Sequence, residues 1–516
     1  MVNNTSNSLI DLLGQEYCDV ISGTAQMLHG LTKQEAQQLA SQKVDFFSDD
    51  YSGRIEALTD KIGEQVMEPF DNDNVGASLD GYNKVTNTDA SPIGCIGPYR
   101  VGENGKLYLA AKSEHYHISV GHNFPGYKLI NNARSLGIPN ATHNNTRGYI
   151  TRKLEQKLIC AVNDVDECSR DMDGVLTSQQ PKVLNRVLNI ETGSLACEAG
   201  IKMMLTRFYR QDNLTKPSVH KGKVPVFFVI ADSGGGKEAN YHGTTITAQT
   251  LRGLWPDLYQ ANEDNDIYKI VSVAINDIAD FEAKIKQYNT GKYKTAGFLH
   301  EIVLMNFGGV LLNKDYLQQA YELCAAYDTP TFCDEIQSCM WYPGMFLFKI
   351  YGIKPDFVIL GKGFSGGEYP ASKVVTTFEM DSMGQFGALV TNGQQELASL
   401  SYLITMKFFE ENAMPIQKLG NYIENLLQQL NDKHHKAIDK IEGKGHLLAI
   451  HFNTLKYAGE FAKRVNAMCI DISAQTYKTN CPPAALIKLP VIMSESLMDA
   501  MVAKFDAAIT QIESEQ

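Results

Sequence analysis

An aspartate and a lysine, Asp334 and Lys362, each follow a short apolar segment of the chain. Residues 331–333 and 356–360 have the length and composition of buried strands. Ligands in open α/β sheets bind just beyond the carboxyl ends of such strands, so both side chains are expected at one site. A buried lysine near a buried carboxylate suits pyridoxal 5'-phosphate (PLP), which forms a Schiff base with a lysine and pairs its pyridinium nitrogen with an acid. The alternative is that Lys362 is a solvated loop lysine and Asp334 a turn residue.

The sequence around these two residues resembles one family in several consecutive motifs. They are Asp334-Glu335-Ile336-Gln337, Tyr351-Gly352-Ile353-Lys354-Pro355-Asp356, Leu360-Gly361-Lys362-Gly363 and Tyr369-Pro370. Together they are similar to the PLP signature of the class III (ornithine/acetylornithine-type) aminotransferases. The resemblance implies that Lys362 is the Schiff-base lysine, Asp334 the pyridinium partner, and Gln337 a hydrogen-bond donor to the phenolic oxygen of the cofactor.

A strand, a turn and a helix at residues 187–209 outline an anion site. Free N–H groups at the start of a helix, together with the helix dipole, favour a phosphate, although Ser194 could also act only as an N-cap. The segment resembles the phosphate-binding Ser-Gly-x-Glu-Ala-x-Glu-Ala motif of the family, with Leu195 in place of its first glutamate. The resemblance implies that Gly193 and Ser194 hold the cofactor phosphate.

The loop after the apolar segment 226–230 offers an aromatic ring. Tyr241-His242-Gly243 resembles the aromatic-His-Gly-x-Thr turn of the family. The resemblance implies that the ring of Tyr241 stacks on the pyridine face of the cofactor, in an offset arrangement that aromatic rings favour. His242 is expected at the cofactor as well, although it could only brace the loop.

Three residues are expected on the substrate side of the site, namely Tyr116, Glu301 and Lys488. Tyr116 and Glu301 stand in segments that resemble those lining the substrate pocket in the family. Lys488 stands where the family has an arginine that clamps a substrate carboxylate. Lysine is a point charge on a flexible stem and lacks the planar fork of arginine. Lys488 therefore either binds a carboxylate less rigidly or pairs with Glu301.

His115 and His117, on either side of Tyr116, could be read as a pair of metal ligands. If residues 97–127 form strands joined at the Asn104-Gly105 turn and 115–117 continue a strand, both rings face the same side. The sequence shows no third ligand, and its ten cysteines include no CxxC pair. No metal is therefore expected.

Strands alternate with helices through most of the chain, which predicts right-handed crossovers and a mainly parallel sheet. With the resemblance, the expected fold is α/β, PLP-dependent transferase fold type I, with helices on both faces of the sheet and a smaller α+β domain. We expect an N-terminal helical extension (1–84), the N-terminal part of the small domain (85–130), a large PLP-binding domain (131–396) and a C-terminal small domain (397–516). The extension and an acidic insertion at 163–180 have no readable role.

The composition is that of an ordinary globular protein, with 516 residues of which 44% are hydrophobic and 21% charged. The net charge of -12 argues against nucleic acid or an anionic membrane as the main partner. The sequence shows no signal peptide and no run of about 18 apolar residues. A cytoplasmic protein with reduced cysteines is therefore expected.

The resemblance also implies an active site shared between two subunits of a homodimer. In the family, a threonine in the loop after the lysine reaches the cofactor phosphate of the neighbouring subunit. Thr391 is the nearest candidate, and it could equally cap a helix. The implied activity is transfer of an amino group from an amino acid or amine to a 2-oxo acid.

Two alternatives to a transaminase remain open. Racemase, aminomutase or decarboxylase activity would use the same cofactor residues on this scaffold. A non-catalytic homologue is the other alternative, suggested by four departures from the family pattern. These are Leu195, Ile302, Glu442 and Lys488.

Overall fold

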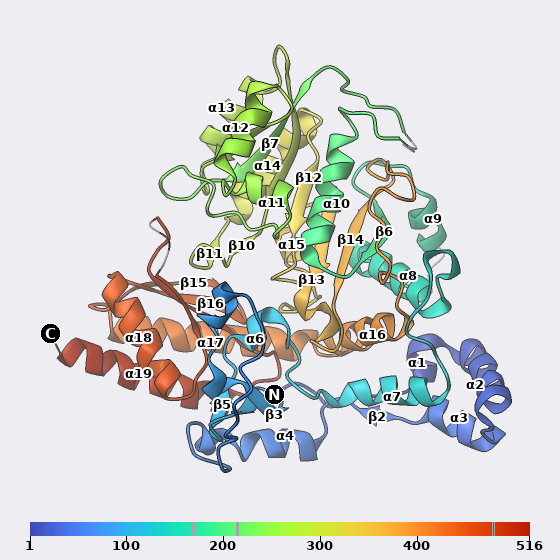
Figure 1. The fold of residues 1–516 in the computed structure, drawn as a ribbon, viewed down its shortest axis with the longest axis vertical. Helices are drawn as coiled ribbons and strands as arrows, with labels where there is room; N and C mark the ends of the chain where they lie inside the picture. Colours follow the sequence, from blue (N-terminus) through green and yellow to red (C-terminus); the bar gives the residue numbers. More distant parts are fainter. Residues whose placement is uncertain (168–170, 213–215, 477, 479, 516) are drawn as a thin grey trace.

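The computed structural model describes residues 1–167, 171–212, 216–476, 478 and 480–515 (Figure 1). Its main feature is a seven-stranded sheet with strand order β6-β14-β13-β12-β9-β7-β8. The strands are β6 (Leu184–Ile190), β7 (Val224–Ile230), β8 (Lys269–Val273), β9 (Tyr293–His300), β12 (Thr331–Asp334), β13 (Phe357–Gly361) and β14 (Ser372–Thr377).

The sheet is mixed but mostly parallel, as predicted. Strands β8, β7, β9, β12 and β13 pair in parallel, whereas β14 is antiparallel to both β13 and β6. All seven residues of β7 are buried, which is typical of a parallel strand covered on both faces. Because parallel strands end at the same edge, the residues that follow β9, β12 and β13 lie close together.

Helices cover both faces of this sheet. On one face α10 (Gly193–Leu205) contacts β6, β9, β13 and β14. On the other face α13 (Ile278–Gln287) and α14 (Lys314–Ala326) pack against each other and against the sheet. Consecutive residues of β7 point to opposite faces of the sheet. Phe227 belongs to the buried hydrophobic cluster on the α10 face. Phe228 contacts Phe281 of α13 on the other face, with ring centres 5.5 Å apart.

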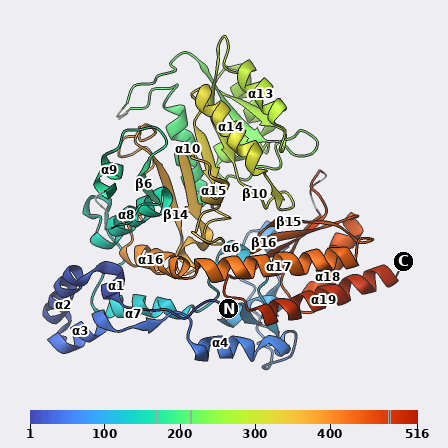
Figure 2. The ribbon, with the colours of Figure 1, turned by 180° about the vertical axis from the view of Figure 1, so that it is seen from behind.

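A smaller sheet lies below the first in Figures 1 and 2, with strand order β15-β16-β18-β17. Its elements are β15 (Ile438–Lys444), β16 (Leu447–Phe452), β17 (Ser473–Gln475) and β18 (Ala484–Lys488), with helices α17 (Ala413–Lys433), α18 (Leu455–Ala467) and α19 (Glu495–Ser514). A three-stranded sheet of β3 (Pro92–Ile96), β4 (Tyr99–Gly102) and β5 (Leu107–Leu109) joins it through a bridge between Leu109 and Ile470.

The apolar pattern from Leu397 onward predicts one long helix into the small domain, and the structure has two. Helix α16 (Glu396–Glu411) ends at Asn412, which also begins α17. Helix α16 is buried almost all round, whereas only one side of α17 is buried. The single apolar stretch in the sequence therefore comprises a core helix and an amphipathic one.

The N-terminal region contains the helices α1 (Leu9–Leu13), α2 (Gln15–His29), α3 (Lys33–Ser41) and α4 (Asp49–Glu56). Capping boxes begin α1 and α3, because Ser8 and Thr32 exchange hydrogen bonds with acids three residues on. Tyr17 of α2 stacks on Tyr149 of α8 (Tyr149–Asn163), with ring centres 4.3 Å apart. Of the insertion expected at 163–180, residues 168–170 lie outside the described part.

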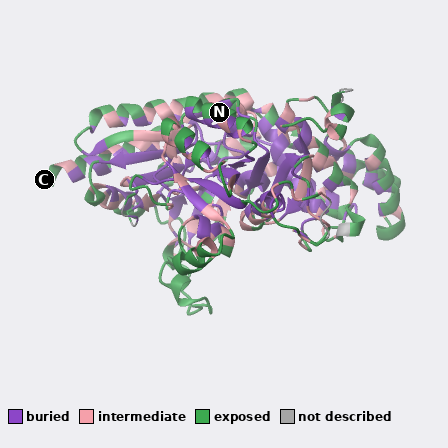
Figure 3. Cartoon of the chain, turned by 90° about the horizontal axis from the view of Figure 1, so that it is seen from above, coloured by how far each residue is buried: buried purple, intermediate pink, exposed green. Residues whose placement is uncertain are grey.

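Buried residues run through the middle of the molecule, while the outer helices expose one side (Figure 3). Among the described residues, no helix is long and apolar enough to cross a bilayer.

Candidate active site

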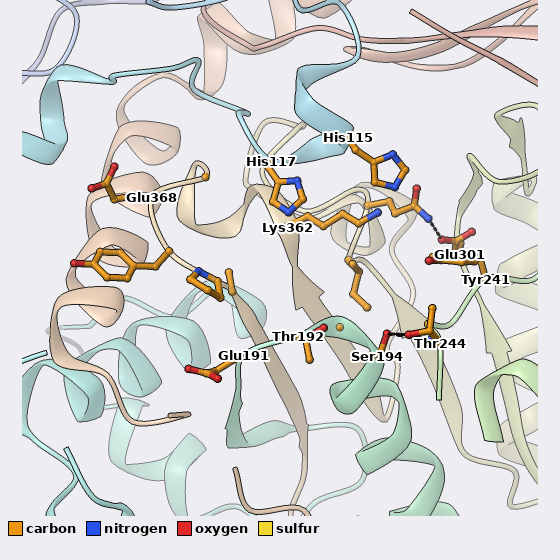
Figure 4. Close-up of a pocket in the computed structure, with 18 residues that line it drawn as sticks. His115, His117, Glu191, Thr192, Ser194, Tyr241, Thr244, Glu301, Lys362 and Glu368 are labelled. Carbon is orange, nitrogen blue, oxygen red and sulfur yellow. Dashed lines mark hydrogen bonds between the residues drawn. The ribbon is translucent and has the colours of Figure 1, made fainter. Parts of the chain in front are cut away.

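A cavity of about 600 Å³ opens at the carboxyl edge of the seven-stranded sheet (Figure 4). This volume is typical of small-molecule sites. The ends of β6, β9 and β13, the start of α10 and the loop after β7 contribute to its walls. Six residues singled out from the sequence line it: Gly193, Ser194, Tyr241, Glu301, Gln337 and Lys362.

Lys362 follows β13 and has a left-handed backbone, with φ of 44°. Its Nζ is buried, has no hydrogen-bond partner among the described residues, and lies 4.5 Å from the ring centre of Tyr116. Burial lowers the pKa of Lys362 to about 8, and the nearby Glu301 and Asp334 oppose this change. Such an amine is partly neutral near pH 7 and can act as a nucleophile.

Asp334 ends β12 and is held by three hydrogen bonds. Its Oδ1 accepts from the Ile336 N–H at 3.0 Å, and its Oδ2 accepts from His242 Nδ1 at 2.8 Å and from the Cys197 thiol at 3.5 Å. A carboxylate has no proton to donate, so the His242 proton lies on Nδ1. His242 is not among the residues that line the cavity, and its buried Nε2 has no partner in the described structure. His242 thus braces Asp334.

Cys197, His242 and Asp334 are also the group of potential metal ligands found among the described residues, with ligand atoms within 4.8 Å of one another. Burial, with Asp334 close by, raises the pKa of the Cys197 thiol well above its ordinary range. A protonated thiol is a poor ligand, because metals bind the thiolate. The hydrogen-bonded arrangement of the three side chains accounts for their proximity.

The sequence pattern predicts a strand around His115 and His117, but the structure has no strand there. Ser113–Tyr116 form one turn of left-handed helix, α6, with φ of 49°, 46°, 60° and 69°. This conformation costs L-residues about 1–2 kcal/mol each. His115 and His117 still line the cavity, and Figure 4 shows their rings above Lys362.

Contacts with distant residues hold this left-handed turn in place. Arg100 is buried and its Nη1 donates to Glu114 Oε1 at 2.5 Å, while Nη2 donates to Asp471. The Ser113 hydroxyl donates to the backbone oxygen of Lys488 at 2.5 Å. These partners lie up to 375 residues away in the sequence, so tertiary contacts, rather than local propensity, fix the turn.

Glu301 and Gln337 form a buried pair at the edge of the sheet. Gln337 Nε2 donates to Glu301 Oε1 at 2.9 Å, as drawn in Figure 4, and Glu301 Oε2 has no partner among the described residues. Burial, followed by the charge of Asp334, raises the pKa of Glu301 well above its ordinary range. Gln337 uses one of its two amide protons in this bond, which leaves the other for a ligand.

Lys488 ends β18 and lies against the ring of Tyr116. Its Nζ is 4.2 Å from the ring centre, and no ion pair joins it to a described residue. Burial, followed by the charges of Lys362 and Lys112, lowers the pKa of Lys488 to about 7. Of the two roles considered for Lys488, pairing with Glu301 is therefore absent from the part of the chain that the structure describes.

The start of α10 and the Tyr241 loop meet at the bottom of the cavity. Thr192, not Ser194, is the N-cap residue, and Ser194 Oγ accepts from the Thr244 N–H at 3.0 Å. Gly243 permits this approach, because a Cβ there would lie 2.6 Å from Ser194 Cα. The first N–H groups of a helix lack partners within it, so this end of the cavity suits an anion.

Thr391 is exposed and does not line the cavity. It does not cap α16 either, since that helix begins at Glu396 with Gln395 as its N-cap. The role expected for Thr391 at a subunit boundary stays a prediction.

The comparisons with known proteins decide the family. The model of the aminotransferase class-III family matches residues 97–482. The chain belongs to the class III aminotransferases. An ornithine aminotransferase of Plasmodium chabaudi chabaudi is 36% identical over 191 residues, which are 35% of this chain and 43% of that protein. One from Exiguobacterium is 26% identical over 352 residues, 66% of this chain and 78% of the relative.

Solved structures of aminotransferases share the fold. A transaminase from the marine bacterium Virgibacillus aligns with a TM-score of 0.68 at 16% identity, covering 89% of this chain and 99% of that one. The ornithine aminotransferase of Toxoplasma gondii aligns with a TM-score of 0.62 at 18% identity, covering 82% and 91%. The predicted fold type I architecture is therefore confirmed. The chain spans less than half the length of the first curated relatives that it matches.

Sequence reasoning missed Arg252, which follows the short helix α11 (Ile246–Leu251). Its guanidinium carbon lies 5.2 Å from the ring centre of Tyr241. The turn at Gly253, with φ of 87°, follows directly. A lone arginine before a glycine carries no motif, so only the fold shows that it faces the site.

Proposed function

We propose that this protein is a PLP-dependent aminotransferase that moves an amino group from an amino acid or amine to a 2-oxo acid. One observation carries the proposal. The amine of Lys362, which has no hydrogen-bond partner among the described residues, lies in the wall of a cavity that also holds Gln337 and the start of α10. Family membership supports it, because the same residues resemble the PLP signature of the class.

The residues present fit PLP in this cavity. Lys362 would bind its aldehyde carbon, Asp334 would face the ring nitrogen, and the start of α10 at Gly193 and Ser194 would take the phosphate. Tyr241 offers a ring face and Gln337 a free amide proton near the phenolic oxygen. When bound, PLP withdraws electrons from the substrate carbon that loses its proton.

Lys362 is proposed as the residue that moves this proton. Its neutral Nζ would take the proton from the substrate carbon and return it at another position. The lowered pKa of Lys362, about 8, keeps part of the population neutral and able to accept a proton. The same burial excludes water from the reacting atoms.

Asp334 is proposed to keep the ring nitrogen protonated, with His242 as its positioning residue. The His242 and Cys197 contacts orient Oδ2, while the Ile336 N–H holds Oδ1. A carboxylate has about four acceptor sites, so these bonds leave room for one more donor. On the substrate side we propose Glu301, Lys488 and Tyr116, as expected from the sequence.

The first test is Lys362→Ala, with Lys354→Ala as its matched control because Lys354 is exposed just upstream. We expect the purified protein to show the visible absorbance of lysine-bound PLP, and the Lys362→Ala variant to lack it and all activity while folding normally. Lys354→Ala should behave like the unmodified protein. An absorbance band that survives Lys362→Ala would mean that another lysine binds the cofactor.

A donor screen separates transamination from the other PLP reactions. Amino acids, ω-amines and diamines are offered with pyruvate or 2-oxoglutarate as acceptor. A transaminase loses its visible absorbance with a donor alone and regains it with an oxo acid. A racemase, aminomutase or decarboxylase consumes one substrate without an acceptor, and a non-catalytic homologue shows no conversion.

Three further points belong to the same proposal. We propose a homodimer with shared sites, a cytoplasmic location, and domain boundaries at residues 84, 130 and 396. The nine cysteines that the structure describes are free thiols, as expected in a reducing compartment. The seven-stranded sheet lies within 131–396 and the four-stranded sheet within 397–516, which supports the division.

A further inference from the structure

A cysteine, a histidine and a glutamate form a partly exposed row beside the three-stranded sheet, outside the cavity that Lys362 lines. Cys95 belongs to β3, Glu114 lies in α6, and His122 follows α6 along the chain. Two backbone hydrogen bonds between Gly97 and His122, of 2.8 and 2.9 Å, bring the end of β3 beside this histidine. The three side chains are therefore brought together by the fold and not by a local motif.

His122 is in the middle of the row. Its Nε2 lies 3.3 Å from Glu114 Oε1, and its ring is also hydrogen-bonded to the Cys95 side chain. Asn123 Nδ2 adds a second donor, 3.7 Å from Cys95 Sγ. Burial alone would lower the pKa of His122, but the bonds to Cys95 and Glu114 raise it to about 9. The ring is therefore a cation at neutral pH, and a cation beside a sulfur favours the thiolate, which is the nucleophile.

Two neighbours hold this row in place. Arg100 Nη1 donates at 2.5 Å to Glu114 Oε1, the same oxygen that faces His122. The Tyr51 hydroxyl of α4 donates to the His122 carbonyl at 3.1 Å. The charged and titratable groups around His122 are thus Cys95, Glu114 and Tyr51, with Arg100 behind the carboxylate.

The arrangement of the row differs from that of a metal site. Among the described residues, the group whose ligand atoms converge is the Cys197 cluster described above. Cys95, His122 and Glu114 instead follow one another, as a nucleophile, an imidazole and the acid that orients it do in enzymes with an activated nucleophile. A thiol in this arrangement is suited to react with an electrophile.

Cys95 also borders a cavity of about 430 Å³. The cavity walls include the cationic side chains of Arg54, Lys61 and Arg100, and no acid is among the described residues that line it. Cys95 is the one thiol that is not buried among the nine that the structure describes. A small molecule with negative charge is therefore favoured next to the sulfur.

We propose that Cys95 is a modification site, at which its thiolate, held by His122 and Glu114, reacts with small disulfides that carry carboxylates. The thiolate attacks one sulfur of the disulfide, so a bond from Cys95 to that sulfur forms and the original S–S bond breaks. The leaving sulfur takes the bonding electron pair, and the proton that Cys95 gave to His122 passes to it. The protein thiol is thereby oxidised to a mixed disulfide, and half of the small disulfide is reduced to a thiol. This site is independent of the proposed aminotransferase function.

The first test measures thiol modification of the full-length, PLP-loaded protein. Dithiobis(nitrobenzoate) is an anionic aromatic disulfide whose released thiolate gives the rate from its absorbance, and peptide mapping by mass spectrometry identifies the modified residue. We expect Cys95 to be modified first and Cys95→Ser to lack this fast phase. A fast phase that maps to another cysteine, or that persists in Cys95→Ser, would overturn the proposal.

His122→Gln tests the positioning residue, because glutamine can keep the backbone bonds to Gly97 but carries no charge. It should slow the modification of Cys95 at least about 10-fold at pH 7. Its rate should also rise more steeply between pH 6 and pH 8 than that of the unmodified protein, because the cation that favours the thiolate is gone. Equal rates and equal pH dependence would overturn the proposal. A faster reaction in His122→Gln would overturn it as well, since His122 would then only shield the sulfur.

A neutral reagent tests the charge preference. Replacing both Arg54 and Lys61 by glutamine should slow modification by dithiobis(nitrobenzoate) about 3-fold or more and leave modification by the uncharged dithiodipyridine unchanged. Lys33→Gln is the matched control, since Lys33 is exposed in α3 and does not line the cavity, and it should alter neither rate. A double variant that slowed both reagents equally, or neither, would overturn the proposed preference for anionic disulfides.

Discussion

Lys488 shows how a single residue can tie the active site to the stability of the fold. It is 1% exposed and lies on the Tyr116 ring. Burial, followed by Lys362 and Lys112, lowers its pKa from 10.5 to about 7. Between these two values the unfolded chain binds a proton that the folded protein does not, so this residue makes stability rise with pH. Below pH 7 the folded protein carries a charged, buried amine.

Lys488→Met should therefore stabilise the protein more at pH 6 than at pH 9. Between the folded and unfolded pKa values of Lys488, deprotonation of Lys488 raises the folding equilibrium constant of the unmodified protein about tenfold for each pH unit. The stability difference between the variant and the unmodified protein therefore becomes smaller as pH rises. Denaturant unfolding of both proteins at the two pH values measures it. If the difference in unfolding free energy between the two proteins did not change with pH, Lys488 would have the same protonation in the folded and unfolded states. The control Lys354→Met, on the surface, should change the unfolding free energy by the same amount at both pH values.

The residues of the site differ in how far the sequence reveals them. Asp334, Gln337 and Lys362 stand near strand ends within a recognisable order of motifs. Gln337 and Lys362 line the cavity, whereas Asp334 is buried and is not among the lining residues. The contact of His242 with Asp334 joins residues 92 apart, and no local pattern encodes it. No local sequence pattern indicated Arg252 either. Its position depends on how the loop after β7 folds back.

At the scale of elements, strands and helices of the large sheet were predictable because burial gives them regular apolar periods. The left-handed turn at α6 was not, because its alternating sequence reads as a strand. Arg100 pairs with Glu114 of this turn and with the distant Asp471, and these contacts hold the unusual backbone in place. A local pattern thus fails where distant charges, rather than an apolar face, determine the conformation.

The short turn that carries Lys362 gives a prediction about an element. Gly366 has φ of 59°, and a Cβ there would overlap the Tyr127 hydroxyl. The Tyr127 hydroxyl cannot move away without losing its hydrogen bond, because it is buried and donates to the Ser365 carbonyl at 2.7 Å. Gly366→Ala should therefore lose about 1–3 kcal/mol of stability from overpacking, in addition to the cost of its positive φ.

Gly344→Ala separates the two effects. Gly344 also has a positive φ, of 72°, but a Cβ there would meet no atom within 4 Å. Its substitution should show the backbone cost alone when both variants are unfolded in denaturant. Equal losses at the two positions would mean that Tyr127 moves aside and that the turn is not packed as described.

At the scale of the whole molecule, a cavity of about 410 Å³ lies between two regions that fold around separate sheets. This cavity takes Tyr241, Arg252 and Gln337 from one region and Ser473 and Lys488 from the other. Sequence patterns describe each sheet but not the surface where they meet. A pattern local to one sheet therefore does not reveal which residues meet in this cavity.

The shared active site of a homodimer gives the last prediction. If Thr391 of one subunit completes the cofactor site of the other, Lys362→Ala and Thr391→Glu damage different halves of the same site. Thr391 is exposed in the single chain and follows the exposed Phe386 closely in the sequence, as expected for a segment that meets a partner. Glutamate at position 391 would repel the cofactor phosphate. Each variant alone should be inactive.

Mixing the two inactive variants, after unfolding and refolding them together, should restore activity. Random pairing makes half of the dimers mixed, and each mixed dimer has one site with both changes and one site with neither, so about a quarter of all sites are intact. If Thr391 instead served its own subunit, every site in the mixture would carry one change and no activity would return. Measuring the rate before and after mixing, with light scattering to confirm the dimer, distinguishes the two arrangements. Recovery near a quarter would identify a site built from both subunits, because no rearrangement within single chains can produce it.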